Sequence, residues 1–278
     1  MKRQTFLQRY FKRVIALPQD HGSWVFLLSP LLIGLFVGGR WHAACLPLII
    51  AALVVFLIRQ PVTMVVKIIS RRRPPADLPA VLFWISIYAV VGLLMLVWLI
   101  SLGWGYLLVL VLPGLPVFAW HLILVSRRAE RRQIGVEVVG SGVLALAAPA
   151  AFWVSRGQHD PMGWMLFVLT WFQSAASIVY AYLRLEQRLW KDMPGAIERL
   201  RIAHRAWLYA SFNLIGVSIL SLAGVLPAWL LLPFLLQWLE TIYGSLRPAM
   251  GWRPTRVGIR QLAVSSLFTL LFIFAWNL

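Results

Sequence analysis

Residues 80–102 read AVLFWISIYAVVGLLMLVWLISL, an apolar run of 23 residues without a charged side chain. About 17 to 25 apolar residues suffice for a helix to cross the hydrocarbon core of a bilayer. The rest of the chain follows the same pattern, because 61% of its 278 residues are hydrophobic and only 13% are charged. The run therefore predicts a membrane-spanning helix, and the composition excludes a soluble enzyme and a disordered chain.

Further apolar runs predict an all-α fold, a polytopic transmembrane helix bundle of about nine spans that forms one membrane domain over residues 1–278. The expected spans are residues 24–38, 43–58, 80–102, 105–125, 136–154, 162–183, 206–222, 228–246 and 261–278. Gly and Pro in the turns 101–105 and 223–227 separate runs that would otherwise form single long helices.

Positive charge predicts the orientation of these spans. If odd-numbered spans run outward from the cytoplasm, 24 of the 26 Lys and Arg residues fall in inner segments, and only Arg40 and Arg156 fall in outer ones. Cytoplasmic loops carry such an excess of Lys and Arg. We therefore expect a membrane protein with its N-terminus inside and its C-terminus outside.

The net charge of +17 lies beside the apolar runs. Basic groups in that position meet lipid headgroups, so the expected partner is a bilayer with anionic headgroups and not nucleic acid. Two inner segments have further structure. Residues 59–79 predict a short interfacial helix that Pro74 and Pro75 stop. Residues 184–205 predict a solvated amphipathic helix that is broken at Pro194 and Gly195.

Two spans carry polar side chains at helical spacing, so that each set shares one face. The first set is Gln173, Ser177, Tyr180 and Arg184, and the second is Gln237, Glu240, Gly244 and Arg247. Glu240 is an acid within an apolar span, so we expect it to bind a partner such as Arg184, Arg205 or a histidine. The two faces either line a cytoplasm-facing cavity for a ligand or form a hydrogen-bond network that only fastens the helices.

The segment before the first span is a second candidate site. Asp20 and Gly22 favour a helix cap, His21 an interfacial side chain and Trp24 a membrane anchor. Alternatively, His21 contacts a ligand or carries a proton near neutral pH.

Glu137 stands in the first turn of a span, where it complements the helix dipole or pairs with Arg131 or Arg132. The small residues that follow, Ser141, Ala145, Ala148 and Ala151, are typical of close helix packing.

No metal site and no cofactor are expected. Cys45 is the one cysteine, and the inner histidines His21, His121 and His204 show no ligand spacing. The candidate ligand-binding residues are Asp20, His21, Gly22, Trp24, Glu137, Gln173, Tyr180, Arg184, His204, Arg205, Gln237 and Glu240.

Three stretches carry a resemblance to a known family: residues 17–24 (LPQDHGSW), Glu137 with residues 144–150 (LALAAPA), and residues 256–263 (RVGIRQLA). They resemble the YwiC-like family of bacterial membrane proteins, which is functionally uncharacterised. The first stretch is similar to that family's Pro-Lys-Glu-His-Gly-Ala-Trp segment and the third to its Gly-Ile-Arg-Glu segment. Asp20 and Gln261 stand where the family has Glu, and Gln261 removes a charge.

The layout that this resemblance implies is similar to that of the UbiA-type prenyltransferases, which hold diphosphate through magnesium on Asp-rich motifs. The inner aspartates here are Asp20, Asp77 and Asp192, without an Asp-x-x-x-Asp spacing, so a site of that kind is not expected. Two functions stay open: an enzyme acting on a prenyl or quinone-type lipid, with arginines in place of magnesium, and a carrier or membrane-assembly partner.

Overall fold

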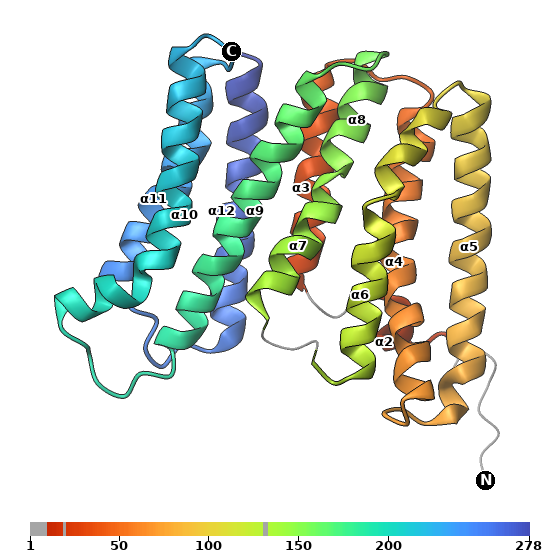
Figure 1. The fold of residues 1–278 in the computed structure, drawn as a ribbon, viewed down its shortest axis with the longest axis horizontal. Coiled ribbons are helices and arrows are strands. Elements are labelled where there is room, and N and C mark those ends of the chain that lie inside the picture. The colour runs from red at the N-terminus through yellow and green to blue at the C-terminus, as the bar shows by residue number, and fades with distance from the viewer. Residues whose placement is uncertain (1–9, 19–20, 130–132) are drawn as a thin grey trace. The chain divides into compact units, whose positions relative to one another are not determined.

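The computed structural model describes residues 10–18, 21–129 and 133–278, and every regular element within these ranges is a helix (Figure 1). The chain forms two compact units. Unit 1 comprises residues 1–21 and 41–136, and unit 2 comprises residues 22–40 and 137–278. The all-α class predicted from the sequence is therefore confirmed.

Unit 1 is built on a pair of long helices. Its elements are α2 (Arg13–Ala16), α4 (Cys45–Ile69), η1 (Pro75–Asp77), α5 (Leu78–Ser101), η2 (Gly105–Val111) and α6 (Gly114–Ser126). α4 packs along α5, and the short α2 lies against both. Ile15 of α2 is fully buried with Met64 and Ile68 of α4 and with Val81 of α5. The Tyr88 hydroxyl donates to the carbonyl of Ala16 at 2.9 Å, which fixes the end of α2.

Unit 2 surrounds one central helix. Its elements are α3 (His21–Gly38), α7 (Ile134–Ala145), α8 (Ala147–Arg156), α9 (Met162–Gln187), α10 (Ala196–Leu222), η3 (Ala228–Leu230), α11 (Leu231–Leu246) and α12 (Pro254–Trp276). α9 contacts α8, α10, α11 and α12. This central position explains why many polar side chains of α9 are buried, whereas few residues of α10 are.

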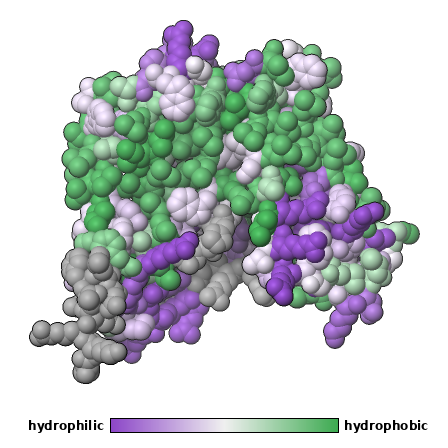
Figure 2. Space-filling view, turned by 180° about the vertical axis from the view of Figure 1, so that it is seen from behind, coloured by the Kyte–Doolittle hydropathy of each residue, from purple (hydrophilic) through white to green (hydrophobic). Residues whose placement is uncertain are grey.

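Seven stretches of the described residues are helical, long and apolar enough to cross a membrane. They are Cys45–Ile69, Pro75–Ser101, Gly105–Ser126, Ile134–Arg156, Met162–Gln187, Ala196–Leu222 and Pro254–Trp276. In each unit, hydrophobic side chains cover the middle of the helices and hydrophilic ones gather at their ends, as the face in Figure 2 shows. This is the architecture of a multi-pass membrane protein.

The length criterion is met by seven helices rather than by the nine that we expected. The other two predicted spans are helical but shorter. Residues 24–38 lie in α3, and residues 228–246 form η3 and α11. α11 has 16 residues, which extend about 24 Å, whereas the hydrocarbon core is about 30 Å thick.

The prediction of a separate interfacial helix after Arg59 is wrong, because α4 runs without a break through Pro61 to Ile69. A proline in a helix removes one N–H donor, and packing compensates for this loss where neighbours hold the helix. Met64 and Ile68 supply that packing in the core of unit 1. The helix ends before the two prolines, where Arg71 takes a positive φ of 54°.

The break predicted at Pro194 and Gly195 is confirmed, since α10 begins at Ala196. Its N-terminal turns are not a separate solvated helix, however. They continue directly into the span that we expected to begin at residue 206, so that α10 has 27 residues.

Small residues bring α3 and α8 into close contact, as the sequence pattern predicted. A Cβ atom on Gly34 would overlap the carbonyl oxygen of Ala148 and would lie 2.7 Å from the Cβ of Ala151. A Cβ atom on Gly38 would lie 2.5 Å from that of Ser155. The Ser155 hydroxyl is 2.7 Å from the carbonyl oxygen of Leu35, which joins the helices by a hydrogen bond.

We expect Gly34→Val to destabilise the protein by about 1–3 kcal/mol or more, because the added side chain must push α3 away from α8. Thermal unfolding of the detergent-purified protein measures this effect. Gly216→Val is the matched control, since a Cβ atom at Gly216 meets nothing within 4 Å. Equal unfolding temperatures for the two variants would contradict the packing described above.

Candidate functional site

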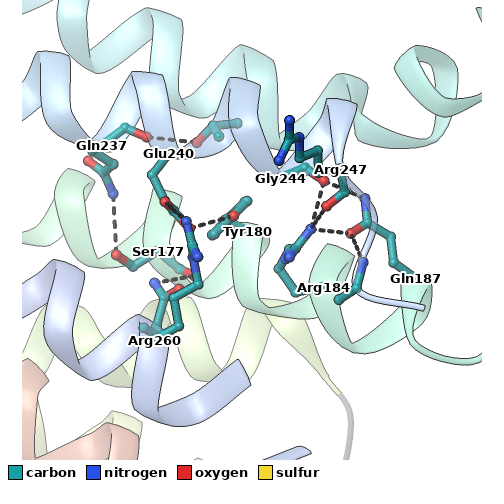
Figure 3. Close-up of polar contacts among 12 residues, drawn as sticks. Ser177, Tyr180, Arg184, Gln187, Gln237, Glu240, Gly244, Arg247 and Arg260 are labelled. Carbon is teal, nitrogen blue, oxygen red and sulfur yellow. Dashed lines mark hydrogen bonds and ion pairs between the residues drawn. The ribbon is translucent and has the colours of Figure 1, made fainter. Parts of the chain in front are cut away.

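Polar side chains and backbone carbonyls from α9, from α11 with the residue that follows it, and from α12 lie close together in unit 2 (Figure 3). We call them the α9–α11–α12 cluster. Its members are Gln173, Ser177, Tyr180, Arg184, Gln187, Gln237, Glu240, Gly244, Arg247 and Arg260. The two polar faces predicted from helical spacing therefore do face each other.

The carboxylate of Glu240 is held by Arg260 from the first turns of α12. The Nε and Nη2 atoms of Arg260 lie 2.6 and 2.8 Å from the two carboxylate oxygens. The Tyr180 hydroxyl donates to the same carboxylate at 2.9 Å. The Glu240 side chain is 11% exposed and that of Arg260 is 36% exposed. Bidentate, charge-assisted hydrogen bonds of this kind are stronger than those between neutral groups.

The predicted partners of Glu240 are therefore wrong. Arg184 lies in the cluster but bonds other groups, and Arg205 lies on an exposed face of α10. The actual partner, Arg260, lies on α12, a third helix that packs against both α9 and α11. Sequence spacing within α9 and α11 contains no information about that third helix.

Arg184 is buried without a carboxylate. The residue as a whole is 2% exposed. Its Nη1 atom lies 2.8 Å from three acceptors that share its two N–H groups, the carbonyl oxygens of Gly244 and Arg247 and Oε1 of Gln187. Its Nη2 atom has no hydrogen-bond partner among the described residues. The guanidinium also lies 5.1 Å from the ring centroid of Trp252. These dipoles and the ring stabilise the positive charge but do not neutralise it.

The amide side chains complete the contact between α9 and α11. The Nε2 atom of Gln237 donates to the carbonyl of Gln173 at 3.0 Å and contacts the Ser177 hydroxyl at 3.3 Å. Gln261, which stands where the YwiC-like family has Glu, donates to the carbonyl of Ser177 at 3.3 Å. A network of this kind replaces the water that a membrane interior lacks.

Gly244 allows α11 to approach α9. A Cβ atom at this position would overlap the hydroxyl and the ring of Tyr180. The same close approach exposes the Gly244 carbonyl to Arg184 and to Gln187. Gly244 thus has a packing role, whereas the sequence pattern had placed it only among the positions on one polar face.

The segment between α11 and α12 is tied to the end of α9. The amide of Ala249 donates to Oε1 of Gln187, and that of Gly251 to the carbonyl of Arg188, both at 3.3 Å. The segment carries Trp252, whose ring centroid lies 4.1 Å from the guanidinium carbon of Arg256 and 5.1 Å from that of Arg184. Further basic side chains therefore lie beside the cluster.

The other predicted site residues do not join the cluster. His204 and Arg205 are exposed on α10. Glu137 lies in the first turn of α7, as predicted, and its carboxylate accepts a hydrogen bond from Tyr182 at 2.6 Å. The predicted partners of Glu137, Arg131 and Arg132, lie outside the described residues.

Gly22 and Trp24 lie in the first turn of α3, where a Cβ atom on Gly22 would meet nothing within 4 Å. Asp20 and the side chain of His21 lie outside the described part of the structure. Within that part, no three His, Cys, Asp or Glu side chains are grouped so that they could hold a metal ion.

Sequence reasoning missed Arg260, Gln187 and Trp252. Arg260 had been counted only as a charge that sets orientation. The available signal was its place in the Gly258-Ile259-Arg260 segment of the resemblance, directly before the last span. Gln187 lies three residues after Arg184 and so extends the same polar face.

The helical architecture and the apolar surface define a multi-pass membrane protein. Residues 17–152 match the family described as YwiC-like protein. The resemblance to this family is therefore confirmed over residues 17–152. The match ends before α9, so the resemblance of residues 256–263 remains a prediction.

One similar protein is "Uncharacterized protein YwiC" of Bacillus subtilis (strain 168). It is 28% identical over 155 residues, which are 55% of this chain and 59% of that protein. The similarity thus spans less than two thirds of the relative's length. No solved structure matches the chain.

We expect a double-mutant cycle of Glu240→Gln and Arg260→Gln to give a coupling energy of about 1–3 kcal/mol, because each charge loses its partner. Thermal unfolding in a neutral detergent measures it. The matched cycle of Glu240→Gln and Arg205→Gln should give coupling near zero. The assignment of Arg260 as the partner fails if the two cycles give equal values.

Proposed function

We propose that this protein crosses the bacterial plasma membrane nine times, with its N-terminus inside, and binds the anionic head of an amphipathic, lipid-like ligand at the α9–α11–α12 cluster. The observation that carries the ligand proposal is the buried guanidinium of Arg184, which has no carboxylate partner among the described residues. A buried charge is costly unless an opposite charge or a full set of hydrogen bonds compensates for it.

Charge at the cluster supports an anion as the ligand. Arg184, Arg247, Arg256 and Arg260 lie there within reach of the rings of Tyr243 or Trp252. Glu240 is the one carboxylate that the structure records in contact with them, and it is paired with Arg260. The cluster therefore keeps an excess of positive charge. A phosphate or carboxylate head offers oxygens that a guanidinium binds through two hydrogen bonds.

The position of the cluster supports an amphipathic ligand. In unit 2, ten described Lys and Arg residues lie at the end where α9 and α11 finish and α10 and α12 begin, and two lie at the opposite end. That asymmetry supports the cytoplasmic placement of this end. A ligand whose head binds there and whose tail enters the bilayer satisfies both environments.

The short helices α3 and α11 enter this proposal as two of the nine crossings. η3 directly precedes α11, so the helical stretch runs from Ala228 to Leu246. Both elements contact α12. A short span is accommodated by local thinning of the bilayer at a modest cost. The charge asymmetry favours an odd number of crossings, since one missing crossing would place every later segment on the opposite side of the membrane.

Reporter fusions test the crossings. A fluorescent protein joined after Met193 should fluoresce, because this segment is placed in the cytoplasm. The same protein joined after Leu278 should stay dark, whereas alkaline phosphatase at that position should be active. Fluorescence at Leu278 would contradict the nine-crossing arrangement.

Binding of farnesyl diphosphate to the detergent-purified protein tests the ligand site, with farnesol as the uncharged probe. We expect the diphosphate to bind more tightly and Arg184→Gln to weaken it roughly tenfold to a hundredfold, since a charge-assisted hydrogen bond is lost. The control, Lys191→Gln, removes an equal charge from an exposed site and should bind as the wild type does.

Because Arg184 is buried, its variant has a structural effect as well. Arg256→Gln avoids this difficulty, since Arg256 is exposed and lies over Trp252. We expect a roughly fivefold weaker affinity for it. Equal affinities of Arg256→Gln, Lys191→Gln and the wild type would overturn the proposed ligand site.

A further inference from the structure

A second basic surface lies on α10, apart from the α9–α11–α12 cluster. Arg201, His204 and Arg205 are exposed and stand at positions i, i+3 and i+4, so they share one face of the helix. Glu198 lies one turn earlier and is also exposed, which leaves the face with net positive charge.

This basic face belongs to a longer apolar stripe. Exposed apolar side chains recur every three or four residues along the same helix, at Ile197, Leu200, Leu208, Phe212, Ile215, Ile219 and Leu222. Arg201, His204 and Arg205 interrupt the stripe between Leu200 and Leu208. A face of this kind is solvated by lipid tails where it is apolar and by headgroups where it is charged.

The spacing along α10 sets the depth of the basic face. From Leu222 to Arg201 the helix rises about 32 Å, and from Leu222 to Arg205 about 26 Å. The hydrocarbon core is about 30 Å thick. When Leu222 lies at one boundary of the core, the three basic side chains therefore lie at the other boundary, at the level of the phosphates.

A groove runs from this level toward the membrane interior. It has a volume of about 290 Å³ and is lined by Phe172 and Ala175 of α9 and by Leu208, Tyr209, Phe212 and Asn213 of α10. Leu208 follows Arg205 by three residues, so the groove begins one turn below the basic face. Its walls are mainly apolar. The Nδ2 atom of Asn213 donates to the carbonyl of Phe172 at 3.0 Å, so one N–H group of this polar side chain is already bonded.

We propose that Arg201, His204 and Arg205, together with this groove, form a binding site for an anionic phospholipid of the surrounding leaflet. The headgroup phosphate lies against the two guanidinium groups, and one acyl chain occupies the groove. The Nδ1 atom of His204 bonds the carbonyl of Arg201 at 2.8 Å. Since a carbonyl only accepts, Nδ1 carries the hydrogen of this bond, which fixes the His204 ring beside Arg201.

Lipid supplies the occupant for two reasons. Charge complementarity selects an anionic head, and the groove lies on helices that are long and apolar enough to cross a membrane. The site does not depend on the ligand proposed for the α9–α11–α12 cluster, because the two share no side chain.

The test uses the full protein in nanodiscs of phosphatidylcholine that contain increasing fractions of phosphatidylglycerol. Native mass spectrometry then measures how much phosphatidylglycerol stays bound. The double variant Arg201→Gln/Arg205→Gln should bind it roughly thirtyfold more weakly, from the loss of two cations near a charged surface. Lys191→Gln/Arg253→Gln is the matched control, with the same change of charge on exposed residues, and should retain wild-type binding.

A second variant tests the groove. Ala175→Leu fills part of it and should reduce the number of retained phosphatidylglycerol molecules while leaving the basic face intact. Binding of farnesyl diphosphate should be unchanged in Arg201→Gln/Arg205→Gln and in Ala175→Leu, which separates this site from the first one. The proposal is overturned if Arg201→Gln/Arg205→Gln and its control lose phosphatidylglycerol equally, or if neither loses any.

Discussion

The pairing of Glu240 with Arg260 is the interaction on which this end of unit 2 depends. A carboxylate inside an apolar bundle cannot be left without a partner, because no water is present to replace one. The two hydrogen bonds from Arg260 join α11 to α12, and the Tyr180 hydroxyl joins α9 to the same carboxylate. One acid therefore fixes the mutual rotation of three helices, and the other polar contacts of the cluster follow from that rotation.

Arg184 is a buried cation, and neutral groups rather than a carboxylate stabilise its charge. Its charge is surrounded by carbonyl oxygens, an amide and an aromatic ring, all of which are neutral. Gly244 is essential to this arrangement, since its missing side chain brings a backbone carbonyl within reach of the guanidinium. Arg184 is therefore a rigid cation, and Gln187, which accepts a hydrogen bond from it, also holds the segment between α11 and α12. Rigid, desolvated cations bind anions more strongly than mobile surface lysines do, because less side-chain entropy is lost.

Hydrophobic runs and helical periodicity predicted the all-α class and the mutual facing of α9 and α11, because both depend on local geometry. Tertiary packing decided what these patterns could not. Pro61 does not end α4, since Met64 and Ile68 are buried beyond it. Arg260 was missed because its role depends on a third helix. His204 and Arg205 lie on an exposed side of α10, apart from the cluster, and a charge count does not reveal which side of a helix is packed.

The two basic surfaces of unit 2 differ in their surroundings, and this difference determines how they respond to salt. Arg201 and Arg205 are exposed, so mobile ions screen their attraction for an anion within about 8–10 Å at physiological ionic strength. Arg184 is enclosed by protein, where screening is much weaker. A lipid at α10 therefore exchanges with the surrounding leaflet, whereas an anion at Arg184 must displace part of an ordered network. The first surface suits a lipid that is always abundant, and the second suits a scarcer ligand that must be held selectively.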